Sequence, residues 1–388
     1  MTHTPSDPER ALLALTLIPG LGPVRIARLL HTLGSPESAL SASAAQLQRI
    51  QGIGSQTASR IVESRPNAVA KTDDELDSIT SAGAHLLTIL SPHYPERLKA
   101  IPAAPPILQV LGSVEALSAH HSLAIVGSRS STIYGTEQTR RFASTLGSAG
   151  FTIVSGGARG IDSAAHSAAL DQRAPTIVVQ GCGLAHTYPS EHHELYQRVA
   201  SSAGAVISEL PFKTPPSADN FPARNRIISG LSLAVLVIEA GHRSGALITA
   251  RHAVEDHHRD VFAIPGRIDS SASAGSNKLL QDGAHLVTDP SQIIEILERS
   301  SQTRAHTPQR SSNHTNQSAP APQSHNPEPL PPLDPESQRL LDALAEPQTA
   351  DQLAESLSMS PAQIRAKATL LEIQGRITRA GANFQRTR

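Results

Sequence analysis

The sequence predicts an α/β fold: an extended Rossmann-like, doubly wound domain with a mostly parallel sheet, between an N-terminal helical domain and a C-terminal winged helix. Three observations lead to this prediction. Seven short runs of Val, Ile and Leu alternate with helical patterns between residues 106 and 300, with little polar alternation. Such strands are buried on both faces, as in a parallel sheet covered by helices. Two glycine-rich helical repeats precede this region, and a separate periodic segment follows it.

The central domain, residues 106–300, is expected to alternate strands and helices. Its strands are expected at Ile107–Leu111, Leu123–Val126, Phe151–Val154, Thr176–Val179, Ala205–Ile207, Ala234–Ile238 and Val261–Ile264. Its helices are expected near Glu137–Ser148, Ile161–Gln172, Glu191–Ser201, Arg224–Leu231 and Ala246–His257. Ligands of open α/β sheets bind at the carboxyl ends of the strands, beside helix N-termini. A binding site is therefore expected at that edge of the sheet.

Residues 1–66 are expected to form a helical domain of the helix-hairpin-helix, SAM-like kind. Gly20-Leu-Gly22 and Gly52-Ile-Gly54 each lie between apolar residues and an amphipathic helix. Glycines at a helix start let backbone N–H groups approach a DNA phosphate, but the same turns also serve helix packing alone. Both interpretations stay open. Residues 67–105, which end in a proline-rich stretch, are expected to be a connector.

The C-terminal part of the chain changes character twice. Residues 301–333 are rich in Ser, Gln, His, Asn and Pro, and this composition predicts a disordered linker. Residues 334–388 are periodic again, and three helices followed by a hairpin predict a winged helix, with helices expected at Gln338–Leu344, Ala350–Leu357 and Ser360–Gln374. Winged helices bind DNA through the third helix or serve as protein contacts, and the sequence leaves both roles open.

Composition excludes several classes of protein. The 388 residues include 33 basic and 34 acidic side chains, which gives a net charge of −1. The overall charge therefore does not indicate a nucleic-acid partner, and DNA binding would need a local basic patch. The single cysteine, Cys182, excludes an intrachain disulfide and a cysteine-cluster zinc site. No secretory signal is visible, and no apolar run is long enough to span a bilayer. We expect a soluble cytoplasmic protein with no membrane contact and no metal.

Two strand ends carry turns suited to phosphate. The strand at 123–126 runs into Gly127, Ser128 and Arg129, which offer close backbone approach, a hydroxyl and a charged fork. The next strand runs into Ser155, Gly156 and Gly157, again before a helix. Neither turn is a P-loop or a GxGxxG fingerprint, so no dinucleotide cofactor is expected, and we expect no other cofactor. The pair predicts an anion site, against the alternative that these glycines only form tight turns.

A third segment adds an aromatic ring and further cations. Phe221 precedes Arg224, Asn225 and Arg226 at the expected start of a helix. An aromatic ring beside arginines suits single-stranded nucleic acid, because bases stack on the ring while the cations neutralise the backbone. Phe221 is equally compatible with a place in the core. We find no convincing catalytic set, so the chain is expected not to be an enzyme.

Taken in order, these motifs resemble the DprA/Smf family (DNA-processing protein A). The matching segments cover the whole central domain: Tyr94-Pro-Glu-Arg-Leu, Gly127-Ser-Arg-Ser-Ser-Thr-Ile-Tyr-Gly, Ser155-Gly-Gly-Ala-Arg-Gly-Ile-Asp, Tyr188-Pro, Ser208-Glu-Leu-Pro, Phe221-Pro-Ala-Arg-Asn-Arg-Ile-Ile-Ser-Gly-Leu, Ser244-Gly-Ala-Leu-Ile-Thr-Ala and Val261-Phe-Ala-Ile-Pro-Gly. The resemblance implies a non-enzymatic, homodimeric protein of natural transformation that binds single-stranded DNA, protects incoming strands and helps load the RecA recombinase. It also implies a positive pocket that includes Arg129, Ser155–Gly157, Phe221 and Arg224–Arg226.

Three departures from the family pattern and two alternatives accompany this expectation. Ala185 lies where the family commonly has Asp, His192 where Asn is frequent, and the turn Asp256-His-His-Arg259 is one residue longer than usual. The alternative function is a nucleotide phosphoribohydrolase of the lysine decarboxylase-like type, which shares the fold. The sequence lacks the Pro-Gly-Gly-x-Gly-Thr turn of those enzymes. A pure protein scaffold is the third hypothesis.

Overall fold

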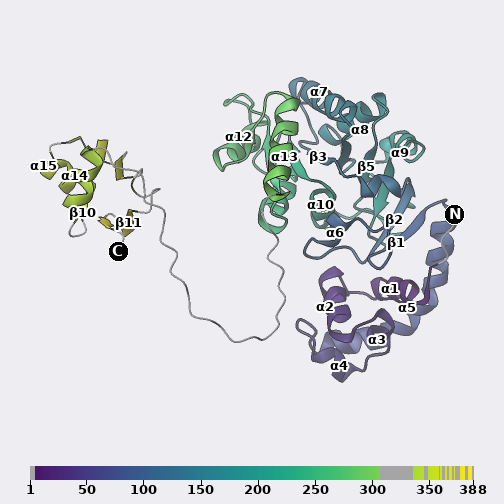
Figure 1. The fold of residues 1–388 in the computed structure, drawn as a ribbon. Helices are drawn as coiled ribbons and strands as arrows, with labels where there is room; N and C mark the ends of the chain where they lie inside the picture. Colours follow the sequence, from purple (N-terminus) through teal and green to yellow (C-terminus); the bar gives the residue numbers. More distant parts are fainter. Residues whose placement is uncertain are drawn as a thin grey trace. The chain divides into compact units, whose positions relative to one another are not determined.

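The structure of the protein is a computed structural model. It describes residues 5–305, 335–344, 348–357, 359–360, 363–364, 367–368, 371, 376–380 and 383–386. The chain divides into two compact units, residues 1–309 and residues 310–388, and each is described by itself. The first unit contains a helical domain and a large α/β domain, and the second is small (Figure 1).

A nine-stranded sheet forms the centre of the first unit, in the order β1-β2-β6-β5-β4-β3-β7-β8-β9. The seven strands from β6 to β9 run parallel, whereas β1 and β2 add antiparallel pairs at one edge. All seven predicted strands are confirmed: β2 (Ile107–Gly112), β3 (Ser122–Val126), β4 (Thr152–Ser155), β5 (Thr176–Val179), β6 (Ala205–Ser208), β7 (Ala234–Val237) and β8 (Asp260–Ala263). The sequence did not predict β1 (His85–Thr88) or β9 (His285–Leu286).

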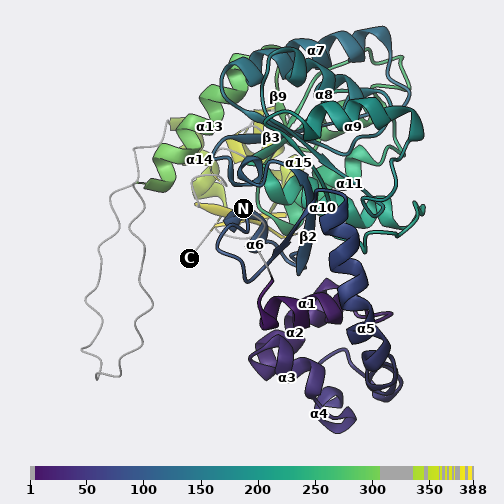
Figure 2. The ribbon, with the colours of Figure 1, turned by 90° about the vertical axis from the view of Figure 1, so that its right-hand side faces the viewer.

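Helices cover both faces of the sheet, as its unbroken apolar strands require. One face packs against α7 (Ile133–Ser148), α8 (Ile161–Asp171), α9 (His193–Ala200) and α13 (Pro290–Ala305). The other packs against α6 (Glu96–Lys99), α10 (Asn220–Leu231) and α11 (Ala246–Arg251). Neighbouring residues of one strand alternate between the two cores: Leu123 and Ile125 pack on the first face, Ala124 and Val126 on the second. Figure 2 shows α7, α8 and α9 side by side along one face. The helix α12 (Ala274–Gln281) lies between β8 and β9 in the sequence.

The predicted helix-hairpin-helix tandem is present in the N-terminal domain. It comprises α1 (Asp7–Thr16), α2 (Pro23–Leu33), α3 (Pro36–Ser41), α4 (Ala44–Gln48) and α5 (Ser55–Ser81). The two glycine turns are joined by arginines of α2. Arg25 donates to the carbonyls of Gly20 and Gly52, and Arg28 donates to that of Gln51. These bonds show a structural use of the turns, and they engage basic groups that a phosphate would otherwise contact.

Residues 67–105, expected to be a connector, instead contain the end of a long helix, an edge strand and the short helix α6. Helix α5 continues through Pro66 to Ser81, and β1 joins the sheet. Pro66 does not end the helix, because buried residues at Ala58, Ile61, Ala68, Thr72 and Ile79 keep one face packed along its length, and this packing outweighs the proline penalty. Farther along α5, the Glu75 carboxylate accepts hydrogen bonds from Gln109 Nε2 (2.7 Å) and the Phe212 N–H (2.6 Å), which tie the helix to the sheet.

The expected linker 301–333 is corrected at its start, because α13 extends to Ala305. Residues 306–333 lie outside the described residues. In the second unit, α14 (Pro335–Ala343), α15 (Ala350–Leu357) and a three-stranded sheet of β10 (Gln348–Thr349), β11 (Ile377–Ala380) and β12 (Asn383–Arg386) agree with the predicted winged helix. Most of the expected third helix, Ser360–Gln374, lies outside the described part, but Ile364, Ala368 and Leu371 belong to the small core.

Candidate nucleic-acid interface

A pocket of about 750 Å³ opens beside the carboxyl ends of β3 and β7. We call it the strand-end pocket. It lies at the place where the sequence predicted a ligand site, since loops and helix starts meet at this edge of a parallel sheet. Its walls come from the turn after β3, the starts of α8, α10 and α11, the loop after β7 and Tyr188. The lining includes Gly127–Ser130, Ala158, Asp162, Tyr188, Pro216–Ala218, Phe221, Arg224, Asn225, Gly241 and Arg243–Ala246.

The Gly-Ser-Arg turn is held rigidly by the loop after β7. The Ser128 N–H donates to the carbonyl oxygen of Glu239 at 2.7 Å. The buried Glu239 carboxylate accepts from the N–H and the hydroxyl of Thr132, both at 2.8 Å, while the Thr132 hydroxyl caps α7 by accepting from the Gly135 N–H. The backbone of the turn is therefore fixed, and the exposed Arg129 side chain is free to face the pocket.

Arg129 lies over an aromatic pair. Its guanidinium carbon is 5.5 Å from the centre of the Phe221 ring, within the range of a cation–π contact. The ring of Tyr188 lies 5.0 Å from that of Phe221, tilted by 38°. A Cβ atom at position 181 would lie only 2.6 Å from Phe221 Cδ1, so Gly181 leaves room for the ring. Phe221 is thus half-buried, neither a plain core residue nor a freely exposed platform.

Arg224 is a buried cation in the wall of the pocket. Its side chain comes from the first turns of α10, it is 5% exposed, and Nη1 donates to the Gly156 carbonyl at 2.7 Å. A Cβ atom at Gly156 would lie 2.8 Å from Arg224 Nη2, so only glycine leaves this space. The Nε of Arg224 has no hydrogen-bond partner among the described residues. Burial lowers the pKa of this guanidinium, and the nearby Asp162 carboxylate opposes that shift.

Asp162 is the acidic member of the pocket. It is 7% exposed and accepts a hydrogen bond from the Ala158 N–H at 3.2 Å. Burial raises the pKa of its carboxyl, while Arg224 and the Ala158 N–H act in the opposite direction. Against this single carboxylate, the lining carries the guanidinium groups of Arg129, Arg224 and Arg243. Although the chain as a whole has a net charge of −1, the pocket is therefore a local positive site.

The structure brings six of the ten predicted site residues to the lining of the strand-end pocket: Gly127, Ser128, Arg129, Phe221, Arg224 and Asn225. Gly156 lines a much smaller adjoining cavity. Ser155 and Gly157 are not among the lining residues of either. Ser155 is fully buried and its hydroxyl donates to the Ile125 carbonyl at 2.6 Å, while the Gly157 carbonyl accepts from the Tyr196 hydroxyl at 3.0 Å.

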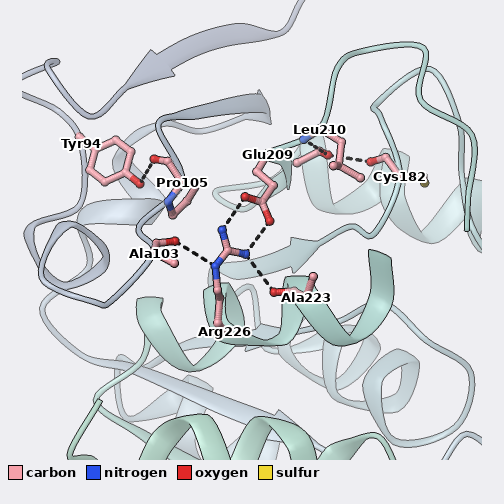
Figure 3. A network of polar contacts seen from close by, with 9 residues as sticks. Tyr94, Ala103, Pro105, Cys182, Glu209, Leu210, Ala223 and Arg226 are labelled. Atoms are coloured by element: carbon pink, nitrogen blue, oxygen red, sulfur yellow. Dashed lines mark hydrogen bonds and ion pairs between the residues drawn. The ribbon is translucent and has the colours of Figure 1, made fainter. Parts of the chain in front are cut away.

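Arg226 lies outside the strand-end pocket and makes a different contact. Both of its terminal nitrogens pair with the Glu209 carboxylate, each at 2.6 Å, and the two side chains are each 11% exposed. It also donates to the carbonyls of Ala103 (3.0 Å) and Ala223 (2.9 Å). Figure 3 shows this guanidinium enclosed by the four acceptors. On an α-helix, residues 224 and 226 point about 200° apart, so only one of them can face the pocket.

Sequence reasoning gave no role to three charged or aromatic residues of the lining: Asp162, Tyr188 and Arg243. Asp162 ended a quoted motif but was assigned no role, Tyr188 was noted only as half of a Tyr-Pro pair, and Arg243 lies one residue before the quoted segment that begins at Ser244. A signal for Arg243 existed, because it follows the carboxyl end of β7, which neighbours β3. No local signal placed Tyr188 on Phe221, since that contact joins segments 33 positions apart in sequence.

The departures from the family pattern have local explanations. At Ala185 the backbone N–H donates to the Phe212 carbonyl, a contact that needs no side chain. His192 Nδ1 lies 2.9 Å from the Gly157 carbonyl. The turn before Arg259, expected to be one residue longer than usual, follows a π-turn over His252–Asp256, and a π-turn inserts one residue into an α-helix. His258 then adopts φ +52°.

The described residues offer neither a metal-ion cluster nor a helix suited to a membrane span. They contain no cluster of three or more His, Cys, Asp or Glu side chains placed to hold a metal ion. No helix among them is both long and apolar enough to cross a membrane.

Family models match three parts of the chain. DNA recombination-mediator protein A matches residues 85–298, the SAM-like helix-hairpin-helix tandem matches residues 12–65, and the DprA winged helix domain matches residues 324–383. The first of these begins at β1 and ends within α13, so it spans the whole nine-stranded sheet. The three matches follow one another in the order of the three predicted domains.

Individual relatives agree with the family models. Protein Smf of Synechocystis is 38% identical over 74% of this chain and 71% of its own length, and Protein Smf of Escherichia coli is 47% identical over 55% and 57%. The solved structure of DNA processing protein A from Streptococcus pneumoniae superposes with a TM-score of 0.64 at 33% identity, over 76% of this chain and 98% of its own. That from Helicobacter pylori, whose structure concerns its single-stranded DNA binding mode, gives a TM-score of 0.50 at 30% identity, over 56% and 96%. The chain belongs to the DNA recombination-mediator protein A family, also known as DprA or Smf.

Proposed function

We propose that this protein binds single-stranded DNA in the strand-end pocket and acts in DNA processing as a recombination mediator rather than as an enzyme. The observation that carries the proposal is the combination of three guanidinium groups with an aromatic pair in one pocket. Sequence-tolerant binding of a single strand needs this pairing of cations for the backbone with rings for the bases. The Helicobacter pylori relative, which binds single-stranded DNA, supports the same assignment.

The proposed mechanism is capture of the DNA backbone. Arg129 and Arg243 are exposed and make the first phosphate contacts, and Arg129 is preorganised because its turn is fixed by Glu239. Arg224 adds a charge in a buried, low-dielectric position, where its field is screened less than at the surface. Asn225, which donates to the Gly245 carbonyl at 3.2 Å, ties α10 to the loop before α11 and keeps both walls in place. The proposed contacts are to phosphates and to ring faces, so weak sequence preference is expected.

The partners and setting that the family implies belong to the same proposal. We infer that the protein acts in the cytoplasm as a homodimer, protects incoming strands during natural transformation and helps to load RecA. Membership of the family supports these roles. A recombinase can take over a strand only if the mediator releases it, and backbone contacts weakened by salt and competition suit such a handover.

Replacing Arg129 by Ala tests the proposed pocket. We expect the affinity for oligo-dT to fall about tenfold or more, because a charge-assisted contact to phosphate is lost. The slope of log affinity against log salt should become less negative by about 0.7, the value for one phosphate on a single strand. Fluorescence anisotropy of labelled oligonucleotides at several salt concentrations measures both quantities.

The control is Arg140→Ala, which removes an exposed arginine of α7 that does not line the pocket. It should leave the affinity and the salt slope unchanged. A loss in Arg129→Ala that is confined to some base sequences would contradict backbone capture. So would a loss of the same size in both variants.

A further inference from the structure

We propose that Tyr188 is a base-stacking residue of this protein and that Phe221 supports its ring from behind. The inference rests on the proposed function, because it assigns a residue for the nucleobase in the same pocket. The ligand class is an unpaired nucleobase of a single strand. The sequence motifs do not favour Tyr188 over Phe221 as the stacking residue. The arrangement of the side chains in the structure does.

The ring of Phe221 is already engaged by its own protein. Arg129 lies over it, Tyr188 lies against it and Gly181 meets its edge, so a base would have to displace one of these neighbours. Tyr188 is different, because it is 39% exposed despite this contact. The aromatic surface that a base can reach without rearrangement is therefore that of Tyr188.

Tyr188 also lies next to the cations that would bind the phosphates, so a base could reach its ring from the same nucleotide. It lines both the strand-end pocket and the small adjoining cavity of about 20 Å³. Arg129 and Arg224 line the same two cavities, so cations for the phosphates lie next to the ring. A nucleotide spans this combination, with its phosphate at the guanidinium groups and its base against the tyrosine.

The backbone at Tyr188 is fixed before any ligand binds. Its carbonyl oxygen lies 3.0 Å from the buried Tyr196 hydroxyl, whose one proton it shares with the Gly157 carbonyl. The same hydroxyl lies 3.0 Å from the Gly157 carbonyl, which anchors the segment to the turn after β4. A ring on a fixed backbone, supported by a second ring, loses little freedom when a base stacks on it. Bases inside a duplex are stacked on each other, so this contact favours a single strand.

The test compares Tyr188→Ala with wild-type protein on oligo-dT and on an abasic strand of the same length. We expect Tyr188→Ala to bind oligo-dT about 5- to 150-fold more weakly, the range for one stacked base, and to bind the abasic strand as wild type does. Tyr188→Trp keeps a ring and should bind oligo-dT more tightly than Tyr188→Ala. Tyr134→Ala is the matched control, because Tyr134 is also exposed but lies outside the pocket lining.

A second readout does not depend on affinity. The protein has no tryptophan, so the emission of Tyr188→Trp reports on this one position. We expect oligo-dT to quench it and the abasic strand to leave it unchanged. Unchanged emission with saturating oligo-dT would overturn the inference, as would equal loss of affinity for both strands in Tyr188→Ala, or full oligo-dT affinity in that variant. Failure of the wild-type protein to bind either strand would instead overturn the proposed function.

Discussion

The arginines of the strand-end pocket differ in how much of their charge reaches solvent. Arg129 and Arg243 are exposed, whereas Arg224 is 5% exposed and bonded to the Gly156 carbonyl. An exposed cation steers and contacts the strand, but its interaction is screened by salt. A buried one contributes a fixed field that salt reaches poorly. The affinity that persists at high salt should therefore depend most on Arg224, and the salt-sensitive part on Arg129 and Arg243.

A backbone prediction applies at His258, an exposed residue that adopts φ +52° after the π-turn. Such a conformation costs a residue with a Cβ atom about 1–2 kcal/mol, and glycine avoids the cost. Because glycine also makes the unfolded chain more flexible, His258→Gly should stabilise the protein by only about 0.5 kcal/mol. Urea unfolding measures this change. His120→Gly is the control, because His120 is exposed and its φ is not positive. There the added flexibility of the unfolded chain should destabilise the protein. A more stable His120→Gly variant, or a less stable His258→Gly variant, would refute the account.

At the scale of single elements, the Arg226–Glu209 ion pair connects α10 to the end of β6 (Figure 3). Removing one partner leaves a buried charge unpaired, so Arg226→Ala should lower the free energy of unfolding by about 3 kcal/mol. Replacing both side chains, in the double variant Arg226→Met and Glu209→Leu, should restore most of that loss. The double variant should also keep the wild-type salt slope for oligo-dT, because Arg226 is not a pocket residue. A salt slope that is less negative than the wild-type slope by about 0.7 would show that Arg226 contacts a DNA phosphate.

Helix α8 carries a buried histidine that makes stability depend on pH. His166 Nδ1 lies 2.7 Å from Thr176 Oγ1, whose proton goes to the Ile153 carbonyl, so Nδ1 donates. Its Nε2 has no partner among the described residues, and burial lowers the pKa of His166 to about 3. The unfolded chain takes up a proton near pH 6.5 while the folded one does not, so stability is lost as pH falls below that value.

The size of this effect is measurable. Between about pH 7.5 and pH 5, His166 should account for a loss of about 2 kcal/mol in the free energy of unfolding. His166→Gln cannot take up the proton. Over the same pH interval, its free energy of unfolding should therefore fall by about 2 kcal/mol less than that of the wild-type protein. Urea unfolding of both proteins at the two pH values checks this. An identical pH dependence in the variant would show that His166 does not cause the loss.

The elements that the sequence could predict are those whose composition decides their structure. Strands β2 to β8 are short apolar runs, and each of the seven was identified within a residue or two at its ends. The missed strands β1 and β9 lie at the two edges of the sheet, where fewer neighbours require apolar residues. The continuation of α5 beyond residue 66 was not predicted, because the packing of α5 against the rest of the domain is a long-range effect.

At the scale of the whole molecule, the sequence predicted where the site lies better than which residues form it. Strand ends and glycine turns marked the edge of the sheet at which the strand-end pocket opens, and such an edge exists in any open parallel sheet. The directions of Arg224 and Arg226 depend on how α10 is rotated, which its neighbours determine. The contact between Tyr188 and Phe221 joins two loops that only the complete fold brings together.

The central claim is that one strand-end pocket captures a single strand through its phosphates and bases. The most direct measurement is the anisotropy of labelled oligo-dT and of a duplex of equal length, titrated with wild-type protein between about 50 and 200 mM salt. The two exposed guanidinium groups, Arg129 and Arg243, predict a slope of log affinity against log salt of about −1.4 for the single strand, which should bind at least about tenfold more tightly than the duplex. Equal affinity for the two, or binding that salt does not weaken, would contradict the account.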